Sequence, residues 1–257
     1  METMILIAAP GKTAQDPNQP DADRHITPEA IVELSENPGR SQLYDFVMKR
    51  SITSQEIEAR HSPRLRALET AMAIFTGALT FRGDRSIYTT PEGIHEFKEK
   101  LSARSGVWIH SDISLDYTGC KVDLPTLKKA PAKFFRAWVT YPYHSRISID
   151  TEWTQEQTPY IELIKNGKQC LKEIIRGHAM GMGKLALLIP SPGIAEALSI
   201  AAVSAGRQLP ASLDQIGGPF KPGDYASINL KWTGFGEYAI WDRGKREYPI
   251  DVRALST

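Results

Sequence analysis

The loop that follows the first apolar run contains a fragment of a phosphate-binding motif. Gly11-Lys12-Thr13 has the residue types that end a P-loop, in which a glycine-rich turn surrounds a phosphate chain and a lysine contacts it. That motif needs a further glycine at position 6, where the sequence has Leu6. Without this turn there is no backbone cradle for a nucleotide, so we expect no nucleotide hydrolysis. Helix N-termini after Gly11 and Gly193 still offer backbone N–H groups to a single anion.

The six histidines are scattered along the chain, and no two have the spacing of a metal-binding pair: His25, His61, His95, His110, His144 and His178. The sequence therefore predicts no metal site and no cofactor. Arg24-His25 lies just before a helix start, which favours a solvent-exposed pair in front of the N-cap. His61 directly precedes Ser62-Pro63 and is a candidate site residue; the alternative is a strand-end histidine with an ordinary hydrogen bond.

Hydrophobic periodicity predicts the elements that position these residues. Continuous apolar runs predict buried strands, and repeats of three and four predict helices, one of them starting just after Ser62-Pro63. The expected strands are 4–9, 107–109 and 184–189, the expected helices are 28–36, 42–49, 65–75, 158–176 (closed by Gly177) and 194–203, and a hairpin is expected over 225–241. This order predicts an α/β fold, a three-layer α/β/α sandwich with a mostly parallel central sheet.

The chain shows no linker that would divide it, so we expect one domain over residues 1–257 with an irregular cap or insertion around 117–157. Within that insertion, Lys128–Trp138 combines lysines with aromatic residues. Such a stretch binds nucleic acid or a partner protein in some proteins. The favoured interpretation is an amphipathic cap with solvated lysines, including a short helix near 132–138, because long basic side chains commonly cover apolar surface in this way.

Composition excludes several classes of protein. The chain has 31 Lys and Arg against 30 Asp and Glu, so no bulk charge attracts it to nucleic acid or to an anionic membrane. No stretch approaches the roughly 18 apolar residues of a membrane helix. Cys120 and Cys170 are far apart and are expected to be unpaired thiols. We therefore expect a cytoplasmic protein that binds neither nucleic acid nor membrane; its oligomeric state is not predicted.

Three segments, in order, resemble the histidine phosphatase superfamily of the phosphoglycerate-mutase-like kind. The most specific is the family pattern Ser-Pro-Leu-x-Arg-Ala-x-x-Thr-Ala, which Ser62–Ala71 matches closely, with Arg66 at the phosphate-binding arginine. Ile26–Ala30 resembles the family's Leu-Thr-Pro-Glu-Gly helix start. The resemblance covers residues 4 to about 205 and implies the phosphoglycerate-mutase-like fold, in which the segment 117–157 often covers the pocket.

The two catalytic histidines of that family are not present. The first strand of the family ends in Arg-His-Gly, where this chain has Ala9-Pro10-Gly11. The last strand leads into Ser-His-Gly-Gly, where this chain has Ser191-Pro192-Gly193. Proline offers no lone pair and no proton for phosphoryl transfer through phosphohistidine. The resemblance therefore implies a degenerate member, a pseudoenzyme, without phosphohistidine-type phosphatase or mutase activity.

Two hypotheses remain. In the first, the residual pocket binds a small anionic ligand or a protein partner, with Arg66, Lys12, Ser191 and His61 facing it. In the second, an enzyme of the hydrolase type uses rebuilt chemistry in the same cleft. By resemblance, the family's general acid lies on the loop after the next strand, in the region of Asp112 and Asp116, and either would act there with His61. No nucleophile and base occur at a recognisable spacing, which favours the first hypothesis.

Overall fold

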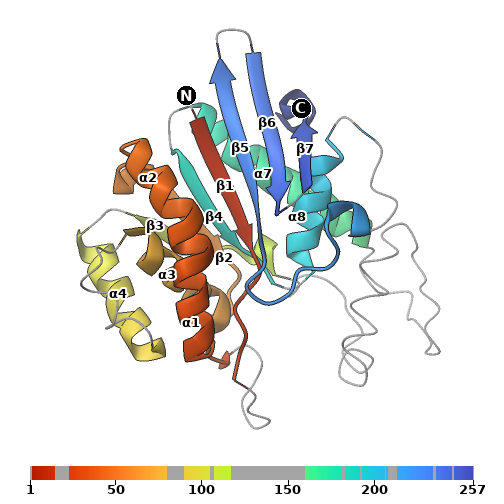
Figure 1. The fold of residues 1–257 in the computed structure, drawn as a ribbon. Helices are drawn as coiled ribbons and strands as arrows, with labels where there is room; N and C mark the ends of the chain where they lie inside the picture. Colours follow the sequence, from red (N-terminus) through yellow and green to blue (C-terminus); the bar gives the residue numbers. More distant parts are fainter. Residues whose placement is uncertain are drawn as a thin grey trace, which may run out of the picture.

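The computed structural model places the first and the last strands of the chain in one central sheet (Figure 1). Its strands are β1 (Glu2–Ala8), β2 (Ile57–His61), β3 (Trp108–Ser111), β4 (Leu185–Ile189), β5 (Tyr225–Thr233), β6 (Gly236–Arg243) and β7 (Arg246–Ile250). The structure describes residues 2–14, 23–79, 90–104, 107–116, 160–180, 183–191, 193–205, 207, 213–233, 236–244 and 246–256. The insertion predicted over 117–157 and Cys120 lie outside these residues.

The sheet has the order β3-β2-β4-β1-β5-β6-β7 and two differently built halves. In the first half β1, β2, β3 and β4 are parallel, with Leu6 opposite Leu187 and Ala59 opposite both Leu187 and Ile109. In the second half β5, β6 and β7 each pair antiparallel to the strand before them in the sheet. Because β6 again runs with β1, five of the seven strands share one direction. The predicted mostly parallel sheet is confirmed.

Helices cover both faces of the sheet (Figure 1). One face carries α1 (Pro28–Leu34), a π-helical segment (Ser35–Tyr44), α2 (Asp45–Lys49), α3 (Leu65–Leu79) and α4 (Pro91–Arg104), and the other carries α7 (Tyr160–Ala179), α8 (Ile194–Val203) and α9 (Val252–Ser256). Short 3-10 turns occupy Ser54–Glu56, Ile113–Leu115 and Leu213–Ile216. Residues of β1 alternate between the two resulting cores, since Ile5 and Ile7 pack with α8 while Leu6 and Ala8 pack with α3. The predicted three-layer sandwich is confirmed.

The helix starts follow from local capping. Thr27 accepts a hydrogen bond from the Ala30 amide and Pro28 occupies the first turn, as the sequence predicts. The predicted end of the first helix before Pro38-Gly39 is confirmed, because Asn37 has extended backbone angles (φ −143°, ψ 111°) and winding resumes only after it. α3 and this segment approach so closely that a Cβ on Gly77 would lie 1.7 Å from the Ser35 carbonyl oxygen.

Two differences concern helix ends and missing elements. α7 continues past Gly177 to Ala179, since Gly177 does not take the left-handed conformation that would end a helix. Strands β2 and β7 and helix α4 were not predicted. Cys170 is a free, buried thiol, as expected. Within the described residues, no helix combines the length and the apolar character that crossing a membrane requires.

Candidate functional site

The carboxyl ends of the parallel strands meet at one edge of the sheet, where ligands commonly bind in α/β folds. Main-chain hydrogen bonds join the loops that follow these strands. The Ser62 amide donates to the Ile189 carbonyl at 2.9 Å, and the Ser191 amide donates to the Leu115 carbonyl at 2.8 Å. The ends of β2 and β4 and the turn after β3 are therefore held together. We call this region the carboxyl-edge site.

Asp116 is the buried acid of the carboxyl-edge site. Its Oδ1 accepts hydrogen bonds from Arg64 Nε at 3.0 Å and from the Ser191 hydroxyl. The side chains of Arg64 and Asp116 are 14% and 3% exposed, so this is a largely desolvated ion pair. Ser191 is fully buried. Arg64 was not predicted as a site residue; it lies in Ser62–Ala71 where the family pattern has leucine.

Asp112, the other candidate acid, has a different environment. Its Oδ1 accepts from the Ser114 amide at 2.9 Å and from the Ser114 hydroxyl at 2.6 Å, so it caps the 3-10 turn after β3. Its Oδ2 lies 3.7 Å from Arg60 Nη1. Arg60 points toward α7, away from the face that His61 occupies, because successive side chains of β2 alternate between the faces of the sheet. The two aspartates, at opposite ends of this short turn, thus have different partners.

Arg66 and the loop after β1 are connected through Thr70. The Thr70 hydroxyl donates to the Arg66 carbonyl at 2.7 Å and accepts from the Gly11 amide at 2.9 Å. Arg66 itself is half-buried near the start of α3. Lys12 is exposed, and its carbonyl accepts from the Thr27 amide at 2.8 Å. Whether Arg66 and Lys12 contact a bound anion stays a prediction.

Pro10 lies buried directly after β1. Its carbonyl accepts from the Gly223 amide at 3.2 Å, and the Ala9 amide donates to the Asp224 carbonyl at 2.8 Å, so the turn is fixed against the β5 side of the sheet. The pyrrolidine ring supplies no donor and no nucleophile. Pro192 lies outside the described residues. The next residue, Gly193, has φ of 87° and is the N-cap of α8, a conformation that favours glycine.

His61 ends β2 on the side of α3 and α4 and is 8% exposed. Its Nδ1 lies 2.7 Å from the Ser62 carbonyl oxygen, which only accepts, so Nδ1 carries the proton. Burial lowers the pKa of His61, and the neighbouring charges of Lys98 and His110 act in the same direction against the Ser62 hydrogen bond. His61 is therefore neutral at pH 7. Its role in a pocket stays a prediction.

A second polar group lies between β2 and α7. Arg60 Nε donates to Glu58 Oε1 at 2.5 Å, and Cys170 of α7 is close enough to interact electrostatically with Arg60. Burial raises the pKa of the Cys170 thiol to about 12, although Arg60 opposes this shift. The thiol therefore stays protonated and is a poor nucleophile at neutral pH.

Comparisons with known proteins identify the fold. No protein-family model matches the sequence, and no curated protein matches it. Among solved structures, the native mycobacterial glucosyl-3-phosphoglycerate phosphatase is similar with a TM-score of 0.53 and 12% identity over 94% of this chain and 97% of that chain.

Two further structures, described as mycobacterial hydrolase 1 and mycobacterial hydrolase 2, have TM-scores of 0.51 and 0.50. They are 13% and 12% identical to this chain, covering 93% and 99% of it and 97% and 95% of their own chains. At such identities the likeness shows the fold alone. The chain has the phosphoglycerate-mutase-like α/β fold.

Proposed function

We propose that the protein is a degenerate histidine-phosphatase-like protein that performs no phosphohistidine chemistry and binds a small anionic ligand at the carboxyl-edge site. The observation that carries this proposal is the buried proline at the end of β1. By resemblance, Pro10 takes the position of the family's nucleophilic histidine. Its turn is fixed because the Gly223 amide donates to the Pro10 carbonyl and the Ala9 amide donates to the Asp224 carbonyl. No local rearrangement of a proline supplies a nucleophilic nitrogen.

Electrostatics support an anion as the ligand. Arg64 and Arg66 bring two guanidinium groups to the start of α3, and Arg64 forms an ion pair with Asp116. The N-terminus of α3, a helix of 15 residues, also places a partial positive charge near this edge. Guanidinium groups beside a helix N-terminus suit a phosphate, sulfate or carboxylate group. A protein partner that presents such a group is an alternative ligand.

The alternative hypothesis, a hydrolase that uses Asp112 or Asp116 with His61, has less support. Asp116 accepts hydrogen bonds from a guanidinium group and from a hydroxyl at the same oxygen, and these contacts favour the ionised carboxylate, so it is poorly suited to donate a proton as a general acid. Asp112 caps a turn. The proton on Nδ1 of His61 is directed at a main-chain oxygen.

A thermal-shift screen tests the proposal. The purified protein is heated with phosphate, sulfate, sugar phosphates, nucleotides and carboxylates, and hydrolysis of an aryl phosphate is measured in parallel. We expect a ligand that raises the melting temperature of the wild type by several degrees at about 100 times its dissociation constant. Arg66→Ala should abolish this ligand-induced shift, and no turnover should be seen.

The matched control is Arg207→Ala, because Arg207 is exposed and lies beyond the far end of α8. This variant should keep the full ligand-induced shift. The ligand-induced change in melting temperature is compared between variants, so that any loss of stability caused by Arg66→Ala itself does not affect the result. Turnover that survives purification and falls in Asp116→Asn would instead support the hydrolase hypothesis.

A further inference from the structure

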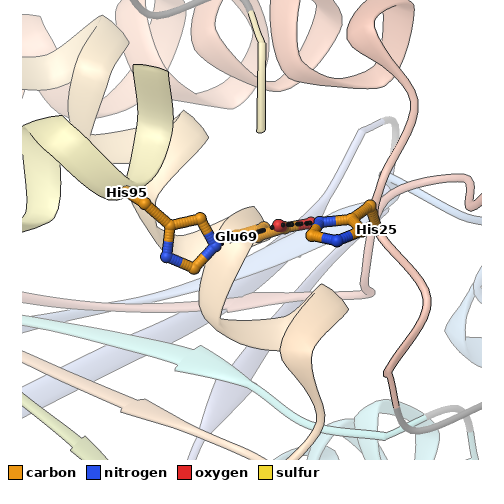
Figure 2. A group of neighbouring side chains, drawn as sticks. All are labelled: His25, Glu69 and His95. Carbon is orange, nitrogen blue, oxygen red and sulfur yellow. Dashed lines mark hydrogen bonds and ion pairs between the residues drawn. The ribbon is translucent and has the colours of Figure 1, made fainter. Parts of the chain in front are cut away.

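Three potential metal ligands from distant parts of the sequence meet beside α3 (Figure 2). His25 precedes α1, Glu69 lies on α3 and His95 lies on α4. One ligand atom from each side chain lies within 4.8 Å of the other two. Glu69 Oε1 is 2.6 Å from His25 Nδ1 and 3.2 Å from His95 Nε2. In Figure 2 both rings turn toward the same carboxylate from opposite sides.

The carboxylate and the imidazoles differ strongly in exposure. The Glu69 side chain is 0% exposed, whereas those of His25 and His95 are 45% and 42% exposed. A buried carboxylate requires hydrogen bonds or a cation to offset its lost hydration. The Ile26 amide donates to Oε2 at 2.9 Å, which leaves Oε1 to the two imidazoles. A cation can therefore reach this oxygen from solvent between two half-exposed rings.

The donor set and its spacing indicate the class of cation. Two imidazole nitrogens and one carboxylate oxygen form a ligand set typical of Zn²⁺ sites that keep one open position. Zinc ligands at about 2.0 to 2.1 Å in tetrahedral geometry lie about 3.3 Å apart. The separation of 3.2 Å between His95 Nε2 and Glu69 Oε1 already matches this value. His25 Nδ1 lies 2.6 Å from Glu69 Oε1 and within 4.8 Å of the His95 nitrogen, so the His25 ring would need to move by roughly 1 Å.

We propose that His25, Glu69 and His95 form a binding site for a divalent transition-metal cation of the Zn²⁺ type, with a fourth position open to water or an external ligand. Glu92, in the first turn of α4, is near enough to interact electrostatically with both histidines. The pKa of Glu92 is lowered chiefly by its own main-chain amide and by Thr90, and then by the charges of His25 and His95. An additional carboxylate near the two histidines increases the attraction for a cation.

Such a cation would join three segments that meet at the Glu69 side chain. His25 belongs to the strand-like pairing of Thr13 with Ile26, and Glu69 is adjacent to Thr70, which holds the Gly11 amide. Binding would therefore stabilise the loop that follows β1 against α3 and α4. This site does not depend on anion binding at the carboxyl-edge site, so either proposal can fail alone.

Calorimetric titration of Zn²⁺ into tag-free protein previously treated with a chelator tests the proposal. The wild type should bind one Zn²⁺ per chain. His25→Ala and His95→Ala should each weaken binding at least about 100-fold, because loss of even an outer-shell partner costs about 10- to 100-fold. His110→Ala is the matched control, since His110 lies on β3 and is also part-exposed. This variant should bind as the wild type does.

Co²⁺ provides a second readout that does not depend on stability. The wild type should give the visible absorption bands of a four-coordinate Co²⁺ site, and Glu69→Gln should remove them while the far-ultraviolet circular dichroism stays unchanged. If Zn²⁺ binds equally well to the double variant His25→Ala/His95→Ala, the proposal is wrong. Failure of the wild type to bind Zn²⁺ would likewise overturn it and leave a purely structural set of hydrogen bonds in which both imidazoles donate to Glu69.

Discussion

Two buried carboxylates near the start of α3 are compensated in different ways. Asp116 has a permanently charged arginine and a buried serine as partners, and the pair is closed from solvent. Glu69 has two half-exposed histidines and a main-chain amide. An arginine stays positively charged, whereas a histidine can be protonated, neutral or bound to a metal. The first arrangement therefore fixes structure, and the second leaves room for exchange.

The largest expected effect tests whether Asp116 depends on its arginine. Arg64→Met should lower the free energy of unfolding by about 3 kcal/mol, because removing one partner leaves a buried charge uncompensated. The double variant Arg64→Met/Asp116→Leu should recover more than half of this loss, since no charge remains buried. Urea unfolding at pH 7 measures both.

The exposed pair Lys49–Asp45 provides the matched control, because its side chains are 70% and 58% exposed. Lys49→Met should cost less than about 0.5 kcal/mol. If Arg64→Met costs no more than this surface variant, Asp116 is stabilised by other contacts and the contrast between the two carboxylates is wrong.

A third histidine environment sharpens the comparison. His178 on α7 is 2% exposed, and neither ring nitrogen has a hydrogen-bond partner among the described residues. Burial lowers the pKa of His178 to about 4, although Glu58 partly opposes this. Unlike the histidines on Glu69, His178 has no contacting carboxylate in the described part of the chain to stabilise a positive charge.

This shift gives the stability a pH dependence with a definite sign. Between pH 6.5 and pH 4 the unfolded chain binds a proton at His178 that the folded protein excludes, so stability is present above pH 6.5 and falls as the pH decreases. The 2.5-unit difference corresponds to about 3 kcal/mol at 1.36 kcal/mol per unit. Unfolding free energies of the wild type and His178→Leu, measured across this range, should diverge by that amount. Parallel curves would show that His178 is protonated in the folded protein.

The buried strands and most helices could be predicted because the hydrophobic pattern of each element lies within its own residues. β2 was not predicted, although Glu58 and Arg60 alternate with buried residues in the pattern of a strand and could have been found by it. α4 begins with Thr90-Pro91-Glu92, the same capping pattern as Thr27-Pro28-Glu29, and could have been found by it. β7 contains Pro249, which is tolerated because this strand lies at the sheet edge.

The polar sites were less predictable because they depend on tertiary contacts. The resemblance pointed to Arg66, whereas the structure adds Arg64, two residues earlier, as the partner of Asp116. Ser191 and Asp116 were both candidates, but nothing in their separation of 75 residues indicated that they would bond. His25 and His95 lie 44 and 26 residues from Glu69, so a search for closely spaced metal ligands could not join them.

The smallest effect concerns the serine of the carboxyl-edge site. Ser191→Ala removes a hydroxyl donor to Asp116 Oδ1 but keeps Arg64 and the main-chain bond from residue 191 to Leu115. We expect a loss of about 1.5 kcal/mol in urea unfolding, typical of a hydrogen bond to a charged group. Ser114→Ala, which removes an exposed hydroxyl from Asp112, should cost less than about 0.5 kcal/mol.

Ser191→Ala should cost more in the Arg64→Met background, because Asp116 then loses the hydroxyl donor as well as the guanidinium group. Groups that share a partner have interaction energies of about 0.5 to 3 kcal/mol, and here the double variant should lose more stability than the sum of the two single losses. Purely additive losses would mean that water already hydrates Asp116. In that case the carboxyl-edge site is open to solvent like the site at Glu69, and the two carboxylates differ only in the cations that contact them.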